Sequence, residues 1–380
     1  MTDWLDWPFF EPHHRELAGR LERWAKATIH DVHPSDADYA CRLLVSELGK
    51  AGFLKLCVAN GSDAPDVRSL AIARATLGRV HGLADFAFAM QGLGSGAISL
   101  FGSEAQRAEW LPKVSSGEAI AAYALTEPET GSDAANIAMR AERDGDSWIL
   151  TGEKSYISNG TIADMLTVFA RTGAVEDGAR GITAFIVRAD DSGLSVAERI
   201  EVVAPHPLAR LKFDGVRAEM LGSEGEGFKV AMQTLNLFRV TVGAAALGFA
   251  RRALDEAVKF ASARKLGGGT LAENSVTQDR LGDMATRVDA SALLIARAAW
   301  EQDVGRGDNR RAAAMAKLHA TEEAQKVIDM AVQMHGGLGV TVGAKVEELY
   351  REVRALRIYE GASEVQRMII ARDLLKEHGK

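Results

Sequence analysis

This sequence of 380 residues has only two cysteines and no excess of positive charge. The spacing of its two cysteines, Cys41 and Cys57, fits no common metal or redox motif, which favours a reducing compartment. Lys and Arg total 45 against 52 Asp and Glu, so the formal net charge is -7. Proteins whose main task is to bind nucleic acid normally carry a basic excess, and this balance argues against that class.

Long apolar runs and targeting signals are missing as well. The longest apolar stretch lies near residues 240–250 and is too short to span a bilayer. The N-terminal segment is interrupted by Asp3, Asp6 and Glu11, so it is typical of neither a signal peptide nor an Arg-rich transit peptide. We therefore expect a soluble, cytoplasmic protein with no membrane partner.

Two regions show helical periodicity. Between residues 16 and 113, apolar side chains recur three and four positions apart, with interruptions predicted at Pro34 and at residues 61–63. Residues 228–263, 274–305 and 311–334 predict three longer helices. Their alanine-rich faces would permit the close packing of a helical bundle.

The region between these helical segments has a different character. Short β-prone runs at residues 120–125, 148–150, 165–170, 182–187 and 211–213 alternate with turn signals at 144–146, 158–160 and 214–215. This alternation predicts a small antiparallel sheet. The expected fold class is α+β and mainly α. Its predicted domains are a helical domain at residues 1–117, a β domain at 118–222 and a helical bundle at 223–380.

Two glycine clusters, at residues 92–96 and 336–339, invite comparison with dinucleotide-binding loops. Neither follows a strand and opens a helix within a βαβ unit, which is the context that gives such a motif its meaning. Both are predicted to be turns that end helices and need a positive φ.

Two polar motifs in the predicted β domain could bind a ligand. The sequence LTEPETGSD at residues 125–133 places Thr126, Gly131 and Ser132 where N–H groups and hydroxyls could meet an anion or a ring edge. Taken alone, this motif could equally be an Asx-type turn. In GEKSYISNG, at residues 152–160, Tyr156 could stack on a ring and Ser158 could form hydrogen bonds.

A third motif, RIYEGASEVQR at residues 357–367, contains a candidate base. Glu360 stands beside the apolar Ile358 and Tyr359, so its pKa could be moved towards neutrality in a partly dry site. The alternative is a surface glutamate paired with a neighbouring arginine.

These motifs occur in order with LGSEGEGF, LNLFRVTVGAAALG, LGDMA and AVQMHGGLG. Together they resemble the acyl-CoA dehydrogenase family from residue 15 to residue 375. The resemblance implies an N-terminal helical domain, a middle β domain and a C-terminal four-helix bundle, assembled as a homotetramer or homodimer. It also implies FAD as cofactor, an acyl-CoA substrate and an electron-transferring flavoprotein as electron acceptor.

The resemblance further implies residue roles. Glu360 would remove the α-proton of the thioester while the β-hydrogen leaves as hydride to N5 of FAD, giving a 2-enoyl-CoA. The backbone N–H of Glu360 would stabilise the enolate oxygen. No metal is implied. The residues implied to contact FAD are Tyr123, Leu125, Thr126, Gly131, Ser132, Tyr156, Ser158, Arg264, Gln333, Gly337, Ala362 and Glu364. Those implied to contact the substrate are Ser132, Asn236, Arg239, Tyr359 and Gly361.

Several positions depart from the family pattern. Phe238 occupies the position at which some branches carry their base, so Glu360 is the only candidate. After Arg264, residues 266–269 (Leu-Gly-Gly-Gly) and Ser275 replace an aromatic, a glycine and a glutamine, which could alter how a neighbouring subunit holds the FAD pyrophosphate. His206, between two prolines, is expected to be structural.

The acyl pocket and some alternatives stay open. Residues 86–99 should line the pocket by resemblance, and Gly92, Gly94 and Gly96 remove side-chain volume there. We hypothesise a branched, cyclic or aromatic-substituted acyl group. The alternative functions are an acyl-CoA oxidase or a flavin monooxygenase on the same fold, a flavin-containing protein associated with nucleic acid, and an inactive scaffold.

Overall fold

The computed structural model describes residues 4–29, 36–58 and 65–379. The interruptions predicted at Pro34 and at residues 61–63 lie outside these ranges. The chain forms two compact units, each built from separate segments. The first unit comprises Met1–Ile29, Asp66–Asp85 and Arg239–Lys380, and the second comprises His30–Pro65 and Phe86–Phe238. The three-domain division along the chain stays a prediction.

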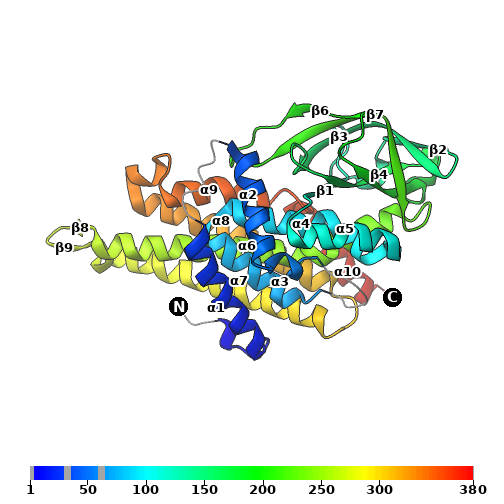
Figure 1. The fold of residues 1–380 in the computed structure, drawn as a ribbon. Coiled ribbons are helices and arrows are strands. Elements are labelled where there is room, and N and C mark those ends of the chain that lie inside the picture. Colours follow the sequence, from blue (N-terminus) through cyan, green and yellow to red (C-terminus); the bar gives the residue numbers. More distant parts are fainter. Residues whose placement is uncertain (1–3, 30–35, 59–64, 380) are drawn as a thin grey trace. The chain divides into compact units, whose positions relative to one another are not determined.

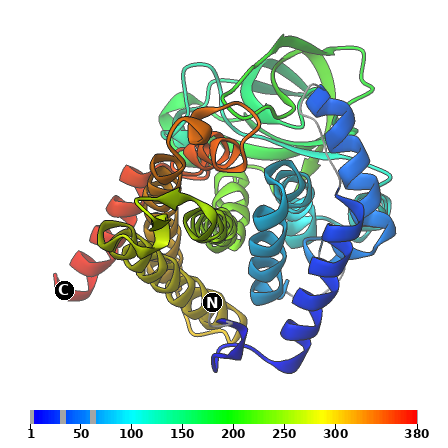
Figure 2. The same cartoon turned by 90° about the vertical axis from the view of Figure 1, so that its left-hand side faces the viewer.

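The first unit is helical. Predicted helices at residues 228–263, 274–305 and 311–334 are confirmed as α6, α7 and α8, with ends that differ by at most two residues. Figures 1 and 2 show α7 and α8 side by side along most of their length. The helices of this unit are α1 (Pro12–Thr28), α3 (Val67–Val80), α6 (Gly227–Ala263, from Arg239 onward), α7 (Ser275–Asp303), α8 (Arg310–His335), α9 (Lys345–Leu356) and α10 (Ser363–His378). Its shorter elements are η1 (Trp4–Asp6), β8 (Lys265–Leu266), β9 (Gly269–Thr270), η6 (Leu271–Glu273) and η7 (Gly336–Val340).

Small residues let these helices approach closely. A Cβ atom at Gly248 of α6 would lie 2.4 Å from the carbonyl oxygen of Ala75 in α3, and one at Gly243 would lie 3.2 Å from that of Ala316 in α8. Ala244 and Ala246 of α6 are fully buried. The alanine-rich faces noted in the sequence therefore form the contacts of the helical core.

The end of α8 confirms one glycine prediction. Gly336 has φ +59 and ends the helix after His335, and η7 follows. Glycine adopts this left-handed conformation without the clash that a Cβ atom would cause.

The second unit combines helices with a β-sheet. Its helices are α2 (Ala37–Lys50), η3 (Phe53–Leu56), α4 (Gly82–Phe101, from Phe86 onward) and α5 (Glu104–Ser116). Its strands are β1 (Ala121–Ala124), β2 (Arg140–Asp144), β3 (Ser147–Ser158), β4 (Met165–Arg171), β5 (Ile182–Arg188), β6 (Leu194–Arg199) and β7 (Leu208–Leu221), with the 3-10 turns η4 (Ala134–Asn136) and η5 (Val175–Gly181).

The seven strands run in the order β1-β4-β2-β3-β7-β5, with β6 added against β7. A further pairing of β4 with β5 closes a ring of strands. Inward-facing side chains such as Leu150, Val168, Phe185 and Phe213 fill its interior. The expected antiparallel sheet is present, except that β4 runs parallel to both β1 and β2.

Two of these strands were not predicted, and one predicted turn is wrong. β2 and β6 expose most of their side chains, so they lack the apolar alternation that identifies a half-buried strand. The predicted turn at Asp214 and Gly215 lies inside the continuous strand β7. Gly215, at φ +73, forms a bulge there, because Leu150 and Thr151 of β3 pair with Val216 and Asp214.

The glycine cluster at residues 92–96 is not a turn either, because it lies inside α4. A Cβ atom at Gly92 would come within 2.7 Å of the Phe238 ring, one at Gly96 within 2.9 Å of that ring, and one at Gly94 within 2.7 Å of the backbone of Ala121. The glycines therefore admit a neighbouring ring and strand at close range. The Phe238 ring takes the space at Gly92 and Gly96, so that space is not open to an acyl group.

Among the described helices, α6 alone is long and apolar enough to cross a membrane, and 72% of its apolar window is buried inside the protein. Burial of this kind is typical of the core helix of a globular protein.

Candidate functional site

Glu360 lies in the turn between α9 and α10, within the first unit. Its φ is +52, a conformation that residues other than glycine rarely adopt, and Gly361 follows at φ +89. Nζ of Lys317 donates a hydrogen bond to the Gly361 carbonyl at 2.8 Å, and Nε2 of Gln366 donates to the same oxygen at 2.8 Å. Backbone strain of this kind costs of order 1–3 kcal/mol and persists only where the surroundings enforce it, often at functional sites.

A second anchor from α8 holds both ends of this turn. The carboxylate of Glu322 pairs with Nη2 of Arg357 at 2.7 Å and accepts a hydrogen bond from Oγ of Ser363 at 2.5 Å. Lys317 and Glu322 therefore fix the Glu360 turn from one helix.

The carboxylate of Glu360 is buried and chemically available. Its Oε2 atom is shielded from solvent and has no hydrogen-bond partner among the described residues. Burial raises the pKa of Glu360, while the nearby charges of Arg74, Lys317 and Arg239 oppose that rise. A carboxylate whose pKa lies above its ordinary value, with an oxygen free to accept a proton, has the properties of a general base.

An ion pair is buried near this carboxylate. Nε and Nη2 of Arg74 donate to the two oxygens of Asp85 at 2.9 and 2.8 Å, and Nη1 donates to Oγ1 of Thr241 at 3.1 Å. Both charged side chains are almost fully buried. Burial alone would lower the pKa of Arg74, but Asp85 raises it above its usual range. Such bidentate pairs are strong and geometrically specific.

Three predicted substrate residues belong to this part of the first unit. Arg239 is buried on α6. Burial lowers the pKa of Arg239, while the negative charge of Glu360 acts to raise it. Burial likewise raises the pKa of Tyr359. Gly361 supplies the carbonyl that Lys317 holds. The structure therefore brings Arg239, Tyr359 and Gly361 together with Glu360.

The other predicted residues of the first unit are more exposed. Ala362 caps α10, and Glu364 extends to solvent near Arg367. Arg264 follows α6, Gln333 lies in the last turn of α8 and Gly337 lies in η7; all three are exposed. Phe260 stacks on His335 at 4.2 Å between ring centroids, which joins the end of α6, just before Arg264, to the end of α8 that carries Gln333.

In the second unit, the loop after β1 is fixed by a buried lysine. Nζ of Lys154 donates to the carbonyl of Leu125 at 3.0 Å and pairs with the carboxylate of Glu127 at 2.8 Å. Glu127 also accepts the N–H groups of Ala138 and Met139. Burial lowers the pKa of Lys154 to about 8, although Glu127 opposes this. The segment that carries Leu125 and Thr126 is therefore rigidly held.

Strand β3 presents Tyr156 beside this loop. The N–H of Ser155 donates to the Thr126 carbonyl at 2.9 Å, so the two motifs lie side by side. A register shift between Lys154 and Ile157 places Tyr156 at φ +56, with 60% of the residue exposed. An aromatic ring held outward in this way fits stacking on a planar ligand.

The remaining predicted residues of this unit are less closely grouped. Oη of Tyr123 donates to the Ala231 carbonyl at 3.2 Å, so the hydroxyl already has a protein partner. Ser158 and Asn236 are half-buried, on β3 and α6, while Gly131 and Ser132 are exposed in the loop.

Sequence reasoning did not identify Arg74, Asp85, Lys154, Lys317 or Glu322. Arg74 and Lys317 stand in apolar, alanine-rich segments, and that placement is the only sequence signal for them; Lys154 stands among polar residues of β3 and has no such signal.

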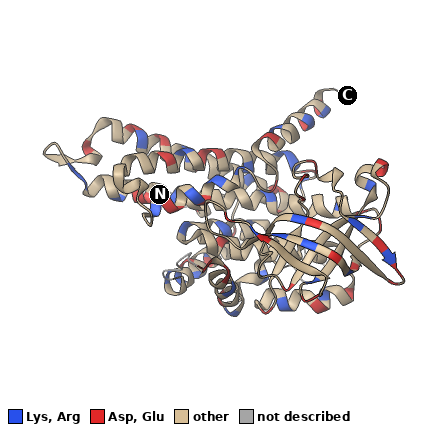
Figure 3. Cartoon of the chain, turned by 90° about the horizontal axis from the view of Figure 1, so that it is seen from above, with Lys and Arg blue, Asp and Glu red and all other residues tan. Residues whose placement is uncertain are grey.

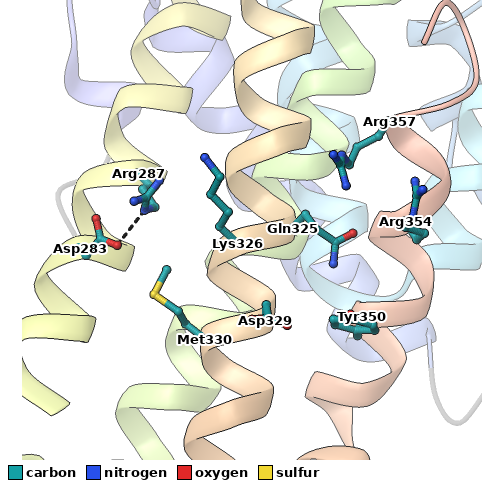
Figure 4. A pocket seen from close by; sticks show the side chains of 9 residues that line it. All are labelled: Asp283, Arg287, Gln325, Lys326, Asp329, Met330, Tyr350, Arg354 and Arg357. Carbon is teal, nitrogen blue, oxygen red and sulfur yellow. Dashed lines mark hydrogen bonds and ion pairs between the residues drawn. The ribbon is translucent and has the colours of Figure 1, made fainter. Parts of the chain in front are cut away.

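A hollow of about 470 Å³ on the first unit lies apart from the predicted residues (Figure 4). Side chains of α7, α8 and α9 line it, among them Arg287, Lys326 and Arg354, and Arg287 pairs with Asp283 at its edge. Neither Glu360 nor Arg239 lines it. Charges of both signs are interspersed over these helices (Figure 3), so the hollow is not part of a large field of one sign.

His13, His14 and Asp66 place possible metal ligands within 4.8 Å of one another. Nδ1 of His14 accepts a hydrogen bond from the N–H of Glu11 at 2.9 Å. The ring proton is therefore on Nε2, which donates a hydrogen bond to the carboxylate of Asp66 at 3.1 Å. Asp66 also caps α3 through the N–H of Ser69. This pattern joins two helix ends and leaves His14 no lone pair for a metal.

Comparison with known proteins identifies the family of this chain. Models of the N-terminal, middle and C-terminal domains of acyl-CoA dehydrogenases match residues 11–118, 122–216 and 225–375. The chain belongs to the acyl-CoA dehydrogenase family. The family resemblance inferred from the motifs is confirmed, and the protein is an oxidoreductase.

Three proteins to which this acyl-CoA dehydrogenase family member is similar are described by identity and coverage. It is 35% identical to the 3-(aryl)acrylate reductase of Clostridium sporogenes, over 97% of this chain and 100% of the relative. It is 35% identical to a probable acyl-CoA dehydrogenase of Mycobacterium leprae, over 99% and 100%. The structure of butyryl-CoA dehydrogenase from Megasphaera elsdenii superposes with a TM-score of 0.89 at 30% identity, covering 96% of this chain and 99% of that one.

FAD is the cofactor that we propose for this chain, and Lys154→Met is expected to weaken its binding about ten-fold or more. The substitution leaves the buried Glu127 without its cation, a change that typically costs about 3–5 kcal/mol, and frees the Leu125 carbonyl. The measurement is the dissociation constant of FAD, followed by flavin fluorescence on dilution. Lys212→Met, at an exposed lysine of β7, is the matched control. Equal FAD affinity in both variants would show that the contacts of Lys154 with Leu125 and Glu127 do not support FAD binding.

Proposed function

We propose that the protein dehydrogenates an acyl-CoA thioester at its α and β carbons to give a 2-enoyl-CoA, with Glu360 as the base. The observation that carries this proposal is the buried carboxylate of Glu360, whose Oε2 has no hydrogen-bond partner among the described residues. Burial raises the pKa of this group, which makes its conjugate acid easier to form inside the protein.

In this mechanism a side chain of the protein removes the α-proton of the substrate. Oε2 of Glu360 accepts it, and the carboxyl group becomes neutral in a buried site that favours the neutral form. A positioned base contributes roughly 10²–10⁴ in rate. The clamp from Lys317 and Glu322 keeps the turn from moving when the carboxylate loses its charge.

The cofactor proposed is FAD, which supplies an acceptor for the β-hydrogen as hydride at its N5 atom. The residues proposed to hold it are those that the sequence predicts, with Leu125 and Thr126 on the loop held by Lys154 and with Tyr156 stacking. The exposed Tyr156 ring and the rigid loop fit a planar, polar-edged group. Arg264, Gln333 and Gly337 are proposed to serve a neighbouring subunit's FAD in a homotetramer or homodimer.

The electron acceptor proposed is an electron-transferring flavoprotein, in the cytoplasm. A structure described as the electron transferring flavoprotein of Acidaminococcus fermentans is similar over 96% of this chain and 98% of that one, with a TM-score of 0.89 and 32% identity.

The acyl group is proposed to be branched, cyclic or aromatic-substituted. Two relatives support this: the 3-(aryl)acrylate reductase, and the isobutyryl-CoA dehydrogenase of Dictyostelium discoideum, which is 38% identical over 74% of this chain and 69% of the relative. The glycines of α4 do not support it, because Phe238 fills the space beside Gly92 and Gly96.

An anaerobic screen tests reaction and substrate together. Purified holoprotein is mixed with butyryl-, octanoyl-, isobutyryl- and 3-phenylpropionyl-CoA, and loss of flavin absorbance is followed. We expect bleaching, fastest with a branched or aromatic thioester. Absence of bleaching with every thioester would contradict the proposed reaction, and a clear preference for octanoyl-CoA would contradict the proposed substrate class. Stoichiometric peroxide in air would indicate an oxidase instead.

A further inference from the structure

Lys317 is a fully buried lysine whose ammonium group forms no ion pair among the described residues. Its Nζ donates to the Gly361 carbonyl at 2.8 Å, and no carboxylate of the described residues lies within ion-pair distance. Fully buried lysines are rare because removing an ammonium ion from water is costly. The Gly361 carbonyl already accepts the amide of Gln366, so hydrogen-bond satisfaction alone does not account for a cation at this position.

The charges around Lys317 point to Glu360. Burial lowers the pKa of Lys317 to about 8, and the charge of Glu360 is the largest influence that opposes this fall. The other charged groups that act on Lys317 are Arg239 of α6, Glu322 of α8 and Glu364 of α10. The influence is mutual, since Lys317 lowers the pKa of Glu360.

Three other charged groups act on Glu360, and one of them, Arg239 of α6, favours the ionised carboxylate as Lys317 does. Arg74 of α3 favours the ionised carboxylate and Asp85 of α4 disfavours it. These two side chains form a bidentate pair, so much of the Arg74 charge is neutralised by its own partner. The ammonium group of Lys317 has no such ion pair among the described residues.

We propose that Lys317 is a positioning residue for the base: its ammonium group fixes the Gly361 carbonyl and keeps the Glu360 carboxylate ionised and ready to accept a proton. This inference rests on the proposed function, in which Glu360 is the base. Lys317 does not contact the reacting atoms in this role; it acts through the turn and through its charge.

The first test is a pH profile of flavin reduction. Holoproteins of the wild type, Lys317→Met, Lys317→Arg and the control Lys326→Met are reduced anaerobically with butyryl-CoA under single-turnover conditions. Lys326 lies on the same helix but is exposed and paired with Glu323. We expect Lys317→Met to slow reduction about ten-fold or more at acidic pH, with partial recovery as the pH rises. Lys317→Arg keeps the charge and should restore the wild-type profile in part.

The sign of this shift follows from the loss of positive charge. Without Lys317, ionising Glu360 becomes less favourable, so its pKa rises further and the acidic limb of the profile moves to higher pH. A purely structural role would lower the rate equally at every pH. Methionine has a similar length and the Gln366 bond remains, so the variant is expected to fold; its FAD content and melting temperature check this.

A second readout needs no turnover. Infrared difference spectra of the ligand-free holoprotein between acidic and alkaline pH, with Glu360→Gln as the reference, report protonation of the Glu360 carboxyl directly. The midpoint should move to higher pH in Lys317→Met and not in Lys326→Met. An unchanged midpoint in a folded, FAD-loaded Lys317→Met would overturn the inference. If Glu360→Gln reduced flavin at the wild-type rate, the proposed function would fail, while the infrared midpoint would still decide the role of Lys317.

Discussion

Glu360→Gln should abolish reduction of the flavin by acyl-CoA at every pH while leaving FAD bound. Glutamine matches glutamate in size but accepts no proton at its amide nitrogen, so the turn keeps its form and loses its base. The expected fall in rate is on the order of 10²–10⁴ or greater. Anaerobic bleaching with the best thioester from the screen measures it. Glu377→Gln, at an exposed glutamate of α10, is the matched control and should reduce normally.

The same substitution should raise thermal stability at neutral pH. Burial raises the pKa of Glu360 above its ordinary value of 4.5, so the folded state prefers the neutral carboxyl group. The stability that this group contributes is fully present below 4.5 and is lost as the pH rises through the raised pKa. Glutamine stays neutral throughout. The melting temperatures of variant and wild type should therefore diverge at neutral pH and converge as the pH falls; a less stable variant at neutral pH would contradict this.

Arg74→Met should destabilise the protein by about 3–5 kcal/mol, because it leaves the Asp85 carboxylate buried without a counter-charge. Thr241 loses a hydrogen bond at the same time. Shifts of the unfolding transition measure the effect. The matched control is Arg79→Met: Arg79 lies on the same helix, α3, but is 44% exposed in its pair with Asp255 and should cost about 1 kcal/mol or less.

A double variant separates the two charges of this pair. Arg74→Met combined with Asp85→Leu removes both, and it should recover most of the stability that Arg74→Met loses, because an apolar pair has no desolvation penalty. If the double variant were as unstable as the sum of the single ones, the penalty would come from lost packing and not from the unpaired carboxylate.

Much of the helical fold could be predicted from the sequence because the signal is long. Helices α6, α7 and α8 each repeat their apolar positions over many turns, so their existence did not depend on any single residue. Strands β2 and β6 could not be predicted, because they lie on the sheet with exposed, polar side chains and carry no apolar alternation.

The glycines of α4 show the opposite limit. A cluster of glycines in a short window predicts a turn, yet Gly92 and Gly96 are helical because the Phe238 ring, distant in the sequence, packs against them. Tertiary contact overrides local propensity here, and no local pattern reveals it.

The candidate site divides in the same way. Glu360 could be predicted because its motif is contiguous, whereas Lys317 and Glu322 act on it from another helix and Arg74 from a third. Which charged side chains become buried depends on how the helices pack. A lysine in an alanine-rich segment gives only a weak indication of this.

At Glu360 the backbone conformation and the side-chain chemistry favour different residues. The positive φ favours glycine, and proton transfer requires a carboxylate. Glycine would relax the backbone there, by about 1–3 kcal/mol, but would delete the carboxylate. Any glutamate kept at this point is torsionally unfavourable for the chain that carries it. A sequence drifting under selection for folding alone would therefore be expected to acquire glycine or asparagine here first, which makes this single position an indicator of whether the chemistry is still being maintained.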